Sequence, residues 1–133
     1  MSQRPRTPVL LRTAALVAVL FGAATIFSGA RVLFGSDAAR QGAGAFVPWV
    51  LWFNTVAGLA YVAAGVGLWL RRAWAVRLSA VLAAVSVLVF AALGVHIALG
   101  GAYEARTVAA MALRCTFWIG LAWFAARAAR AAR

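Results

Sequence analysis

Residues 74–99 read WAVRLSAVLAAVSVLVFAALGVHIAL, a run of 26 residues that contains one arginine, Arg77, and no acid. About 20 consecutive apolar residues suffice for an α-helix to cross the hydrocarbon core of a bilayer. Three further apolar runs lie at about residues 9–30, 46–70 and 107–126. We therefore expect an all-α integral membrane protein, in which residues 1–133 form a single domain of four transmembrane helices in an antiparallel bundle.

The composition agrees with this interpretation. Hydrophobic residues make up 66% of the chain and charged residues 11%, whereas soluble domains have about 45–50% and about 25%. A water-soluble fold could not bury so much apolar surface. The longest connection, residues 31–45, contains Gly35, Gly42 and Gly44, and we predict a flexible polar loop there.

The charge distribution predicts an orientation. Thirteen basic residues, all arginine, stand against Asp37 and Glu104, which gives a net charge of +11. Nine arginines (4, 6, 12, 71, 72, 77, 127, 130 and 133) fall on one side of the predicted bundle and three (31, 40 and 106) on the other. The positive-inside rule then places both termini in the cytoplasm, in a bacterial inner membrane. Because the arginines follow the helix ends, we expect them to contact membrane lipids and expect no nucleic-acid binding.

The first apolar run allows a second interpretation. Arg4 and Arg6 precede it, and Ser28-Gly29-Ala30 resembles the small-residue cleavage site of a secretory signal. We favour a transmembrane helix because the run is long and apolar residues resume at Val32. Cleavage would leave three spans.

Small residues predict the faces on which the helices pack. Lipid gives helices no hydrophobic reason to associate, so close backbone approach at small side chains drives their packing. The first run carries Gly22 and Gly29 in such a stripe, and the second carries Gly58, Tyr61 and Gly65 at helical spacing. We interpret both stripes as helix-packing faces.

Two polar residues lie inside the apolar runs. Arg114 is the eighth residue of the fourth run, and an arginine in such a position costs about 2.5–3.5 kcal/mol on insertion scales, so it should face protein or water. Met111 shares its helix face. Asn54, in the second run, needs hydrogen-bond partners, either on another helix or on a ligand.

Further polar groups are expected at the outer ends of the third and fourth runs. His96 precedes the Gly100-Gly101 turn, which brings it toward Tyr103 and Glu104. We expect an ion pair of Glu104 with Arg106 or Arg114, bridged by His96. Such a cluster either fixes the helix ends or forms a ligand site or ion path.

The inventory of reactive residues argues against several kinds of chemistry. One histidine, one cysteine (Cys115) and two acids per chain do not make a closed metal site or a bis-histidine haem site, so we expect no metal and no cofactor. We assign no catalytic residue. The first run lacks the glutamate of small multidrug transporters, and residues 86–90 lack the threonines of fluoride channels. The chain also lacks the paired cysteines of mercury transporters.

Three functional hypotheses remain. The first is an accessory or scaffold protein that self-associates or joins a larger membrane complex, because small-residue stripes favour helix association. The alternative is a small homodimeric transporter or channel, in which Arg114, His96 and Asn54 line an anion or proton path. The third, an enzyme acting on a lipid or quinone, rests only on polar groups near the outer interface.

Overall fold

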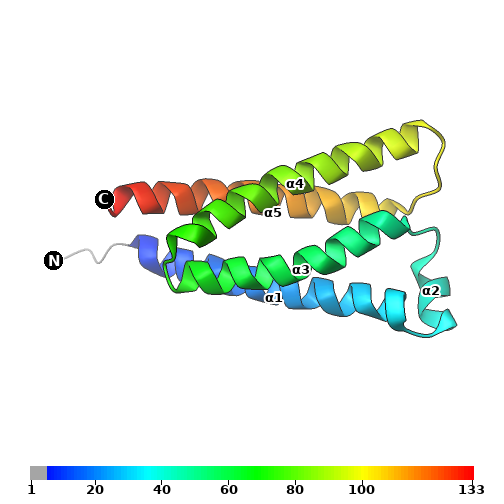
Figure 1. The fold of residues 1–133 in the computed structure, drawn as a ribbon, viewed down its shortest axis with the longest axis horizontal. Helices are drawn as coiled ribbons and strands as arrows, with labels where there is room; N and C mark the ends of the chain where they lie inside the picture. Colours follow the sequence, from blue (N-terminus) through cyan, green and yellow to red (C-terminus); the bar gives the residue numbers. More distant parts are fainter. Residues whose placement is uncertain (1–5) are drawn as a thin grey trace.

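The computed structural model describes residues 6–133, and these fold entirely as helices and their connections (Figure 1). The elements are α1 (Arg6–Phe34), α2 (Asp37–Ala43), α3 (Pro48–Trp69), α4 (Ala73–Ala98) and α5 (Ala105–Ala131). The four long helices are each long and apolar enough to cross a membrane. The chain is therefore an all-helical protein with four candidate transmembrane helices, which suggests a multi-pass membrane protein.

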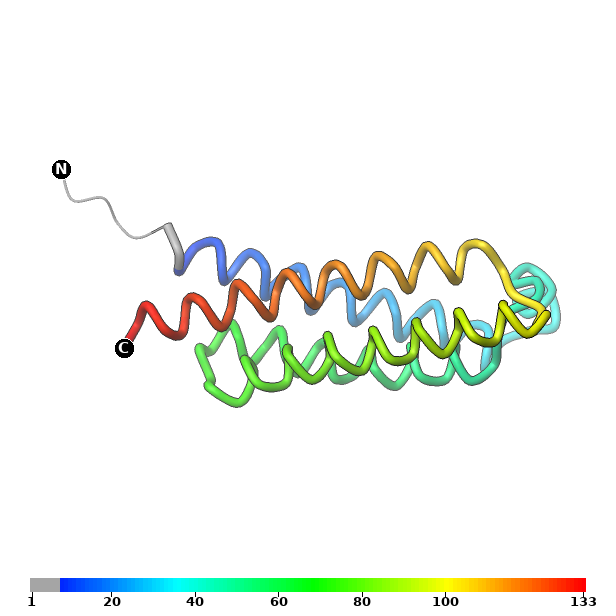
Figure 2. Tube along the Cα trace, turned by 90° about the horizontal axis from the view of Figure 1, so that it is seen from above, coloured from blue at the N-terminus to red at the C-terminus, as the bar shows by residue number. Residues whose placement is uncertain are grey.

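The long helices lie side by side, and each connection occupies one end of the molecule. The start of α1, the α3–α4 turn and the end of α5 lie at one end, called the terminal end below (Figure 1). α2 and the α4–α5 connection lie at the other, called the α2 end. Seen from above, α1 and α5 lie on one side and α3 and α4 on the other (Figure 2), so α1 and α4 occupy diagonal corners.

Local chemistry explains where the helices end. Pro48 opens α3 at its first turn, where its missing N–H costs no hydrogen bond. α3 and α4 both end in a turn that satisfies their last carbonyls, with a left-handed residue just beyond the helix: Arg71 (φ 55°) after α3 and Gly100 (φ 83°) after α4. The turn after α3 is therefore built with an arginine where glycine is the usual residue.

The connection between residues 31 and 45 differs from the prediction of a flexible polar loop. α1 continues to Phe34, and after a short bend α2 forms with Ser36 as its N-cap, whose side chain accepts a hydrogen bond from Ala39 N. Arg40 ties α2 to the end of α1, because its Nη2 and Nε donate to the carbonyls of Leu33 and Val32 at 3.1 and 3.3 Å. Serine capping and an arginine that satisfies open carbonyls thus turn a glycine-containing segment into an ordered helix.

α1 and α3 approach each other closely along their small residues. A Cβ added to Gly22 would lie 2.8 Å from the carbonyl oxygen of Gly58, and one added to Gly65 would lie 2.8 Å from the carbonyl oxygen of Ala15. A Cβ on Gly29 would collide with the Thr55 side chain. These glycines allow backbone-to-backbone contact that any larger residue would prevent.

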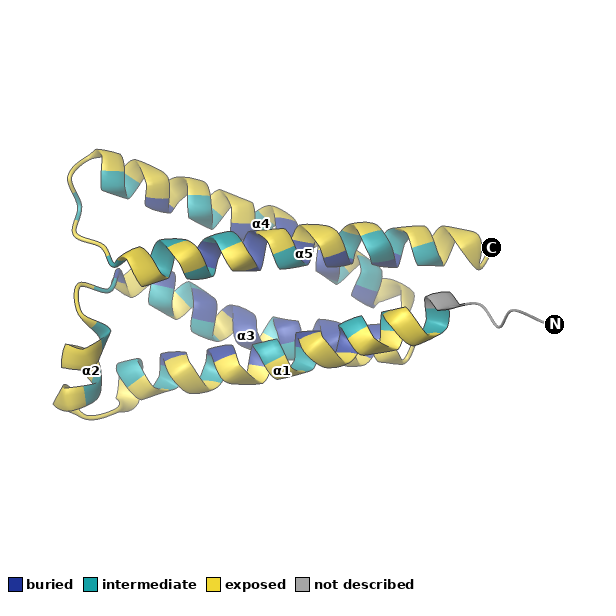
Figure 3. Cartoon of the chain, turned by 180° about the vertical axis from the view of Figure 1, so that it is seen from behind, coloured by how far each residue is buried: buried dark blue, intermediate teal, exposed yellow. Residues whose placement is uncertain are grey.

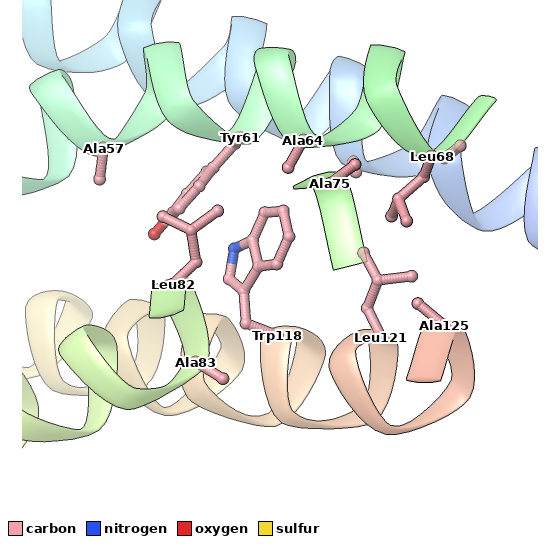
Figure 4. Packing of buried hydrophobic residues seen from close by; sticks show 12 residues of the cluster. Ala57, Tyr61, Ala64, Leu68, Ala75, Leu82, Ala83, Trp118, Leu121 and Ala125 are labelled. Atoms are coloured by element: carbon pink, nitrogen blue, oxygen red, sulfur yellow. The ribbon is translucent and has the colours of Figure 1, made fainter. Parts of the chain in front are cut away.

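Buried apolar residues form a larger cluster in the middle and toward the terminal end, and a smaller one toward the α2 end. Trp118 of α5 and Tyr61 of α3 lie side by side at the centre of the larger cluster, with Leu82 of α4 beside them (Figure 4). Buried residues face inward on every long helix, and exposed ones cover the outward surfaces (Figure 3). Because those outward surfaces carry large apolar side chains, among them Leu20, Leu88 and Trp123, they suit contact with lipid tails.

Candidate functional site

A cavity of about 510 Å³ lies at the α2 end, between α1, α3 and α5 and beneath α2. Each of the four helices contributes part of its lining. α1 provides Thr25, Ser28 and Arg31, while α5 provides Thr107 and Arg114. We call it the outer cavity because it lies at the end of the molecule away from the termini; three of the buried polar side chains, Thr25, Asn54 and Arg114, line it.

Arg114 is the group in this cavity whose burial is hardest to explain structurally. It is 9% exposed, and its Nε has no hydrogen-bond partner. It lies nine residues after Ala105, so its Cα is about 14 Å along the helix from the start of α5. Its Cζ lies 5.6 Å from the ring centroid of Phe21, a cation–π contact that stabilises the charge only in part. A fixed positive charge therefore lines the outer cavity deep in the bundle.

Asn54 brings a second unsatisfied group to the same cavity. Its side chain lies on α3, is 8% exposed, and its Oδ1 has no partner within the described chain. Thr25, on α1, also lines the cavity and is buried. The walls thus carry a cation, an amide and a hydroxyl that could all contact one small polar ligand.

α2 and the segment after it cover the cavity and are tied to α5. The Glu104 Oε1 accepts a hydrogen bond from Ala45 N at 2.8 Å, and Arg106 Nη2 donates to the carbonyl of Gly42 at 3.0 Å. The expected ion pair of Glu104 with Arg106 or Arg114 is therefore replaced by a hydrogen bond to the backbone. The carboxylate satisfies an N–H of the connection, and Arg114 keeps no acidic partner.

The other predicted site residues lie elsewhere. His96 Nε2 lies 3.0 Å from the carbonyl oxygen of Ala102, and its ring packs against Trp49; it does not bridge Glu104. Tyr103 is 44% exposed. Met111 is fully buried in an apolar cluster with Val50 and other residues of α3 and α4. None of these three lines the outer cavity.

Several cavity residues were not predicted. Arg31 was interpreted only as a marker of orientation, Arg106 as such a marker and as one of two alternative ion-pair partners of Glu104, and Ser28 only as part of a signal-like triplet, but all three line the cavity. The sequence contained an indication of the site, because Thr25 and Ser28 of the first run share one helix face. No sequence pattern predicted that α2 would cover the cavity.

Aromatic side chains fill the bundle directly beneath the cavity. Phe21 of α1 stacks on Tyr61 at 5.7 Å and meets Phe117 edge-on at 5.4 Å, while Tyr61 lies 4.8 Å from Trp118. Tyr61 and Trp118 are fully buried. None of these four aromatic residues lines the outer cavity; the layer adjoins it at Arg114, whose Cζ lies 5.6 Å from the ring centroid of Phe21.

The side chains that line the cavity offer positive charge and hydrogen-bonding groups. Among the described residues, no group of three or more His, Cys, Asp or Glu side chains could hold a metal ion. Comparison of the chain with known protein families, with curated proteins and with solved structures found no match. The argument for function therefore rests on the geometry of this cavity.

Proposed function

We propose that the chain is a multi-pass protein of a bacterial inner membrane, an antiparallel bundle with both termini in the cytoplasm. The arginine count supports this orientation, because the terminal end carries most of the arginines and the α2 end few. In this orientation the outer cavity opens in the outer half of the membrane.

Within that membrane the protein binds an anionic ligand in the outer cavity. The observation that carries this proposal is Arg114, a buried arginine without an acidic partner that lines a cavity large enough for a small molecule. Ionisable groups inside a membrane are expensive and commonly mark ligand sites. A planar guanidinium suits carboxylate, phosphate or sulfate oxygens, with which it forms paired hydrogen bonds.

The remaining charges of the cavity favour the same class of ligand. Arg31 and Arg106 also line the cavity, and Glu104 is its one acid. Since Glu104 already accepts a hydrogen bond from Ala45 N, the three arginines outweigh it. The Asn54 amide would orient the ligand, as a few well-placed polar groups do in other ligand pockets.

The role that fits this geometry is that of an accessory binding protein, which presents or senses its ligand within a homo-oligomer or a larger membrane complex. The aromatic layer of Phe21, Tyr61 and Trp118 beneath the cavity supports binding over conduction. A transporter or channel, the alternative, would require a second copy or a rearrangement of that layer.

The test uses the purified protein in phosphatidylcholine nanodiscs. Inorganic phosphate, sulfate or acetate replaces chloride at constant ionic strength, and thermal unfolding is followed by circular dichroism. An anion at ten times its Kd adds about 1.4 kcal/mol to the stability of a protein that binds it only when folded. We expect at least one of the three anions to raise the melting temperature of the wild type.

Arg114→Met should abolish that rise. Arg77→Met is the matched control, because Arg77 is exposed on α4 and does not line the cavity; it should retain the wild-type response. If no anion stabilises the wild type, or if both variants lose the response equally, the outer cavity is not an anion site.

A further inference from the structure

A second cavity, of about 530 Å³, lies at the terminal end of the bundle. It is bordered by the start of α1, the α3–α4 turn and the last turns of α5. Most of its lining is apolar and consists of Leu11, Leu68 and Val76 together with alanines of α5. This terminal cavity shares no residue with the outer cavity.

Three arginines line the terminal cavity: Arg71, Arg72 and Arg133. The two acids of the chain, Asp37 and Glu104, belong to the opposite end, in α2 and at the N-cap of α5. Neither acidic side chain therefore lies near these arginines. An apolar cavity lined by arginines without an acidic side chain is complementary to a molecule that is apolar in one part and anionic in another.

Arg71 adds a more specific observation. In the turn after α3, Arg71 N donates to Leu68 O at 3.0 Å and Arg72 N to Gly67 O at 2.8 Å, the two hydrogen bonds of a Schellman motif. The left-handed position of this motif normally takes glycine, since a Cβ is strained there. Arg71 holds it with φ 55°.

The turn after α4 has the same geometry but a different residue at the left-handed position. Gly100 N donates to Ile97 O and Gly101 N to His96 O, which is the same pair of hydrogen bonds, and the left-handed residue is Gly100. The fold thus uses glycine at one end and accepts a strained arginine at the other. Strained backbone that the rest of the structure must support is typical of functional positions.

We propose that the terminal cavity binds a phospholipid with an anionic headgroup, whose phosphate contacts Arg71 and Arg72 while its acyl chains cover the apolar wall. The position in the bundle agrees, because Trp69 and Trp74 flank the same turn, and tryptophan is enriched where a helix leaves the hydrocarbon. Basic pockets at this level of a membrane protein suit anionic headgroups. The site is independent of the anion-binding role of the outer cavity.

The deciding variant is Arg71→Gly, because glycine removes the guanidinium and relieves the strained φ at the same position. Lipid binding is measured by native mass spectrometry of the full chain in a neutral detergent, titrated with phosphatidylglycerol or phosphatidylcholine. The wild type should bind phosphatidylglycerol at least fivefold more tightly than phosphatidylcholine. Arg71→Gly should lose that preference while melting at the wild-type temperature or above.

Two controls locate the effect. Arg130→Ala removes an exposed arginine of the same end that does not line the cavity, and it should keep the fivefold preference. Arg114→Met should also keep it, since that residue lies in the outer cavity. Inorganic phosphate at millimolar concentration should not displace phosphatidylglycerol, because phosphate cannot cover the apolar wall.

Four results would overturn the proposal. They are equal binding of the two lipids by the wild type, an unchanged preference in Arg71→Gly, an equal loss in either control variant, and displacement by inorganic phosphate alone. The second would leave Arg71 as a purely conformational residue. The last would make the ligand a free anion.

Discussion

Replacing Arg114 with methionine should stabilise the ligand-free protein, and the structure gives the size of the effect. The substitution removes a buried N–H without a partner, which costs about 1–3 kcal/mol when left unsatisfied. It also removes the contact with Phe21 at 5.6 Å, which contributes about 0.5–2 kcal/mol. Methionine fills irregular apolar space without strain. The net expectation is a gain on the order of 1 kcal/mol.

The measurement is equilibrium unfolding of wild type and Arg114→Met in mixed micelles with increasing SDS, in chloride buffer without other anions. A double-mutant cycle with Phe21→Leu isolates the cation–π contribution, which should not exceed about 2 kcal/mol. If Arg114→Met loses more than about 2 kcal/mol, the arginine holds the bundle together and the reasoning fails. A variant that unfolds like the wild type within about 0.3 kcal/mol would mean that the two contributions cancel.

Three further outcomes follow from the packing. Gly22→Leu should destabilise the bundle by about 1–3 kcal/mol in the same unfolding assay, because its Cβ would lie 2.8 Å from the Gly58 carbonyl; Gly120→Leu, where a Cβ meets nothing within 4 Å, should not. Glu104→Ala should speed amide hydrogen exchange in α2, because the acceptor for Ala45 N is lost; Glu104→Gln retains an acceptor oxygen, so faster exchange in that variant as well would contradict this role. Tyr61→Phe should leave stability unchanged or raise it by up to about 1 kcal/mol, since the hydroxyl is buried without a partner; a clear loss would show that the hydroxyl is hydrogen-bonded to a neighbour such as Ser86 or Arg114.

The sequence was sufficient to predict the four candidate spans, because a run such as residues 74–99 has no other stable location than a bilayer. The sequence was not sufficient to predict the structure of the connection at residues 31–45. There the glycines predicted flexibility, but the N-cap Ser36 and the reach of Arg40 to the end of α1 depend on how the bend places α2. Such contacts follow from tertiary geometry and leave no periodic pattern in the sequence.

The candidate site was predicted in part for a similar reason. Arg114 was identified from the free-energy cost of placing an arginine inside a transmembrane helix, and that cost can be judged without knowing which residues surround it. Its expected partner Glu104 was assigned by proximity along the chain, but the carboxylate instead bonds Ala45 N, 59 residues away in sequence. His96 was placed near Glu104 by the same local reasoning, and the turn directs it to the Ala102 carbonyl. Helical spacing identifies a face, but it does not identify what lies opposite.

Stability and anion binding together distinguish the two roles that an intramembrane arginine can have. A structural arginine is satisfied by protein groups, so its removal destabilises the fold and leaves no anion response to lose. A binding arginine is left unsatisfied until its ligand arrives, so its removal relieves the ligand-free bundle and abolishes the response. The unpartnered Nε of Arg114 and the absence of Glu104 from its hydrogen bonds favour the second case. In that case the charge of Arg114 destabilises the ligand-free protein, and the bound ligand supplies the charged partner that no residue of the helices provides.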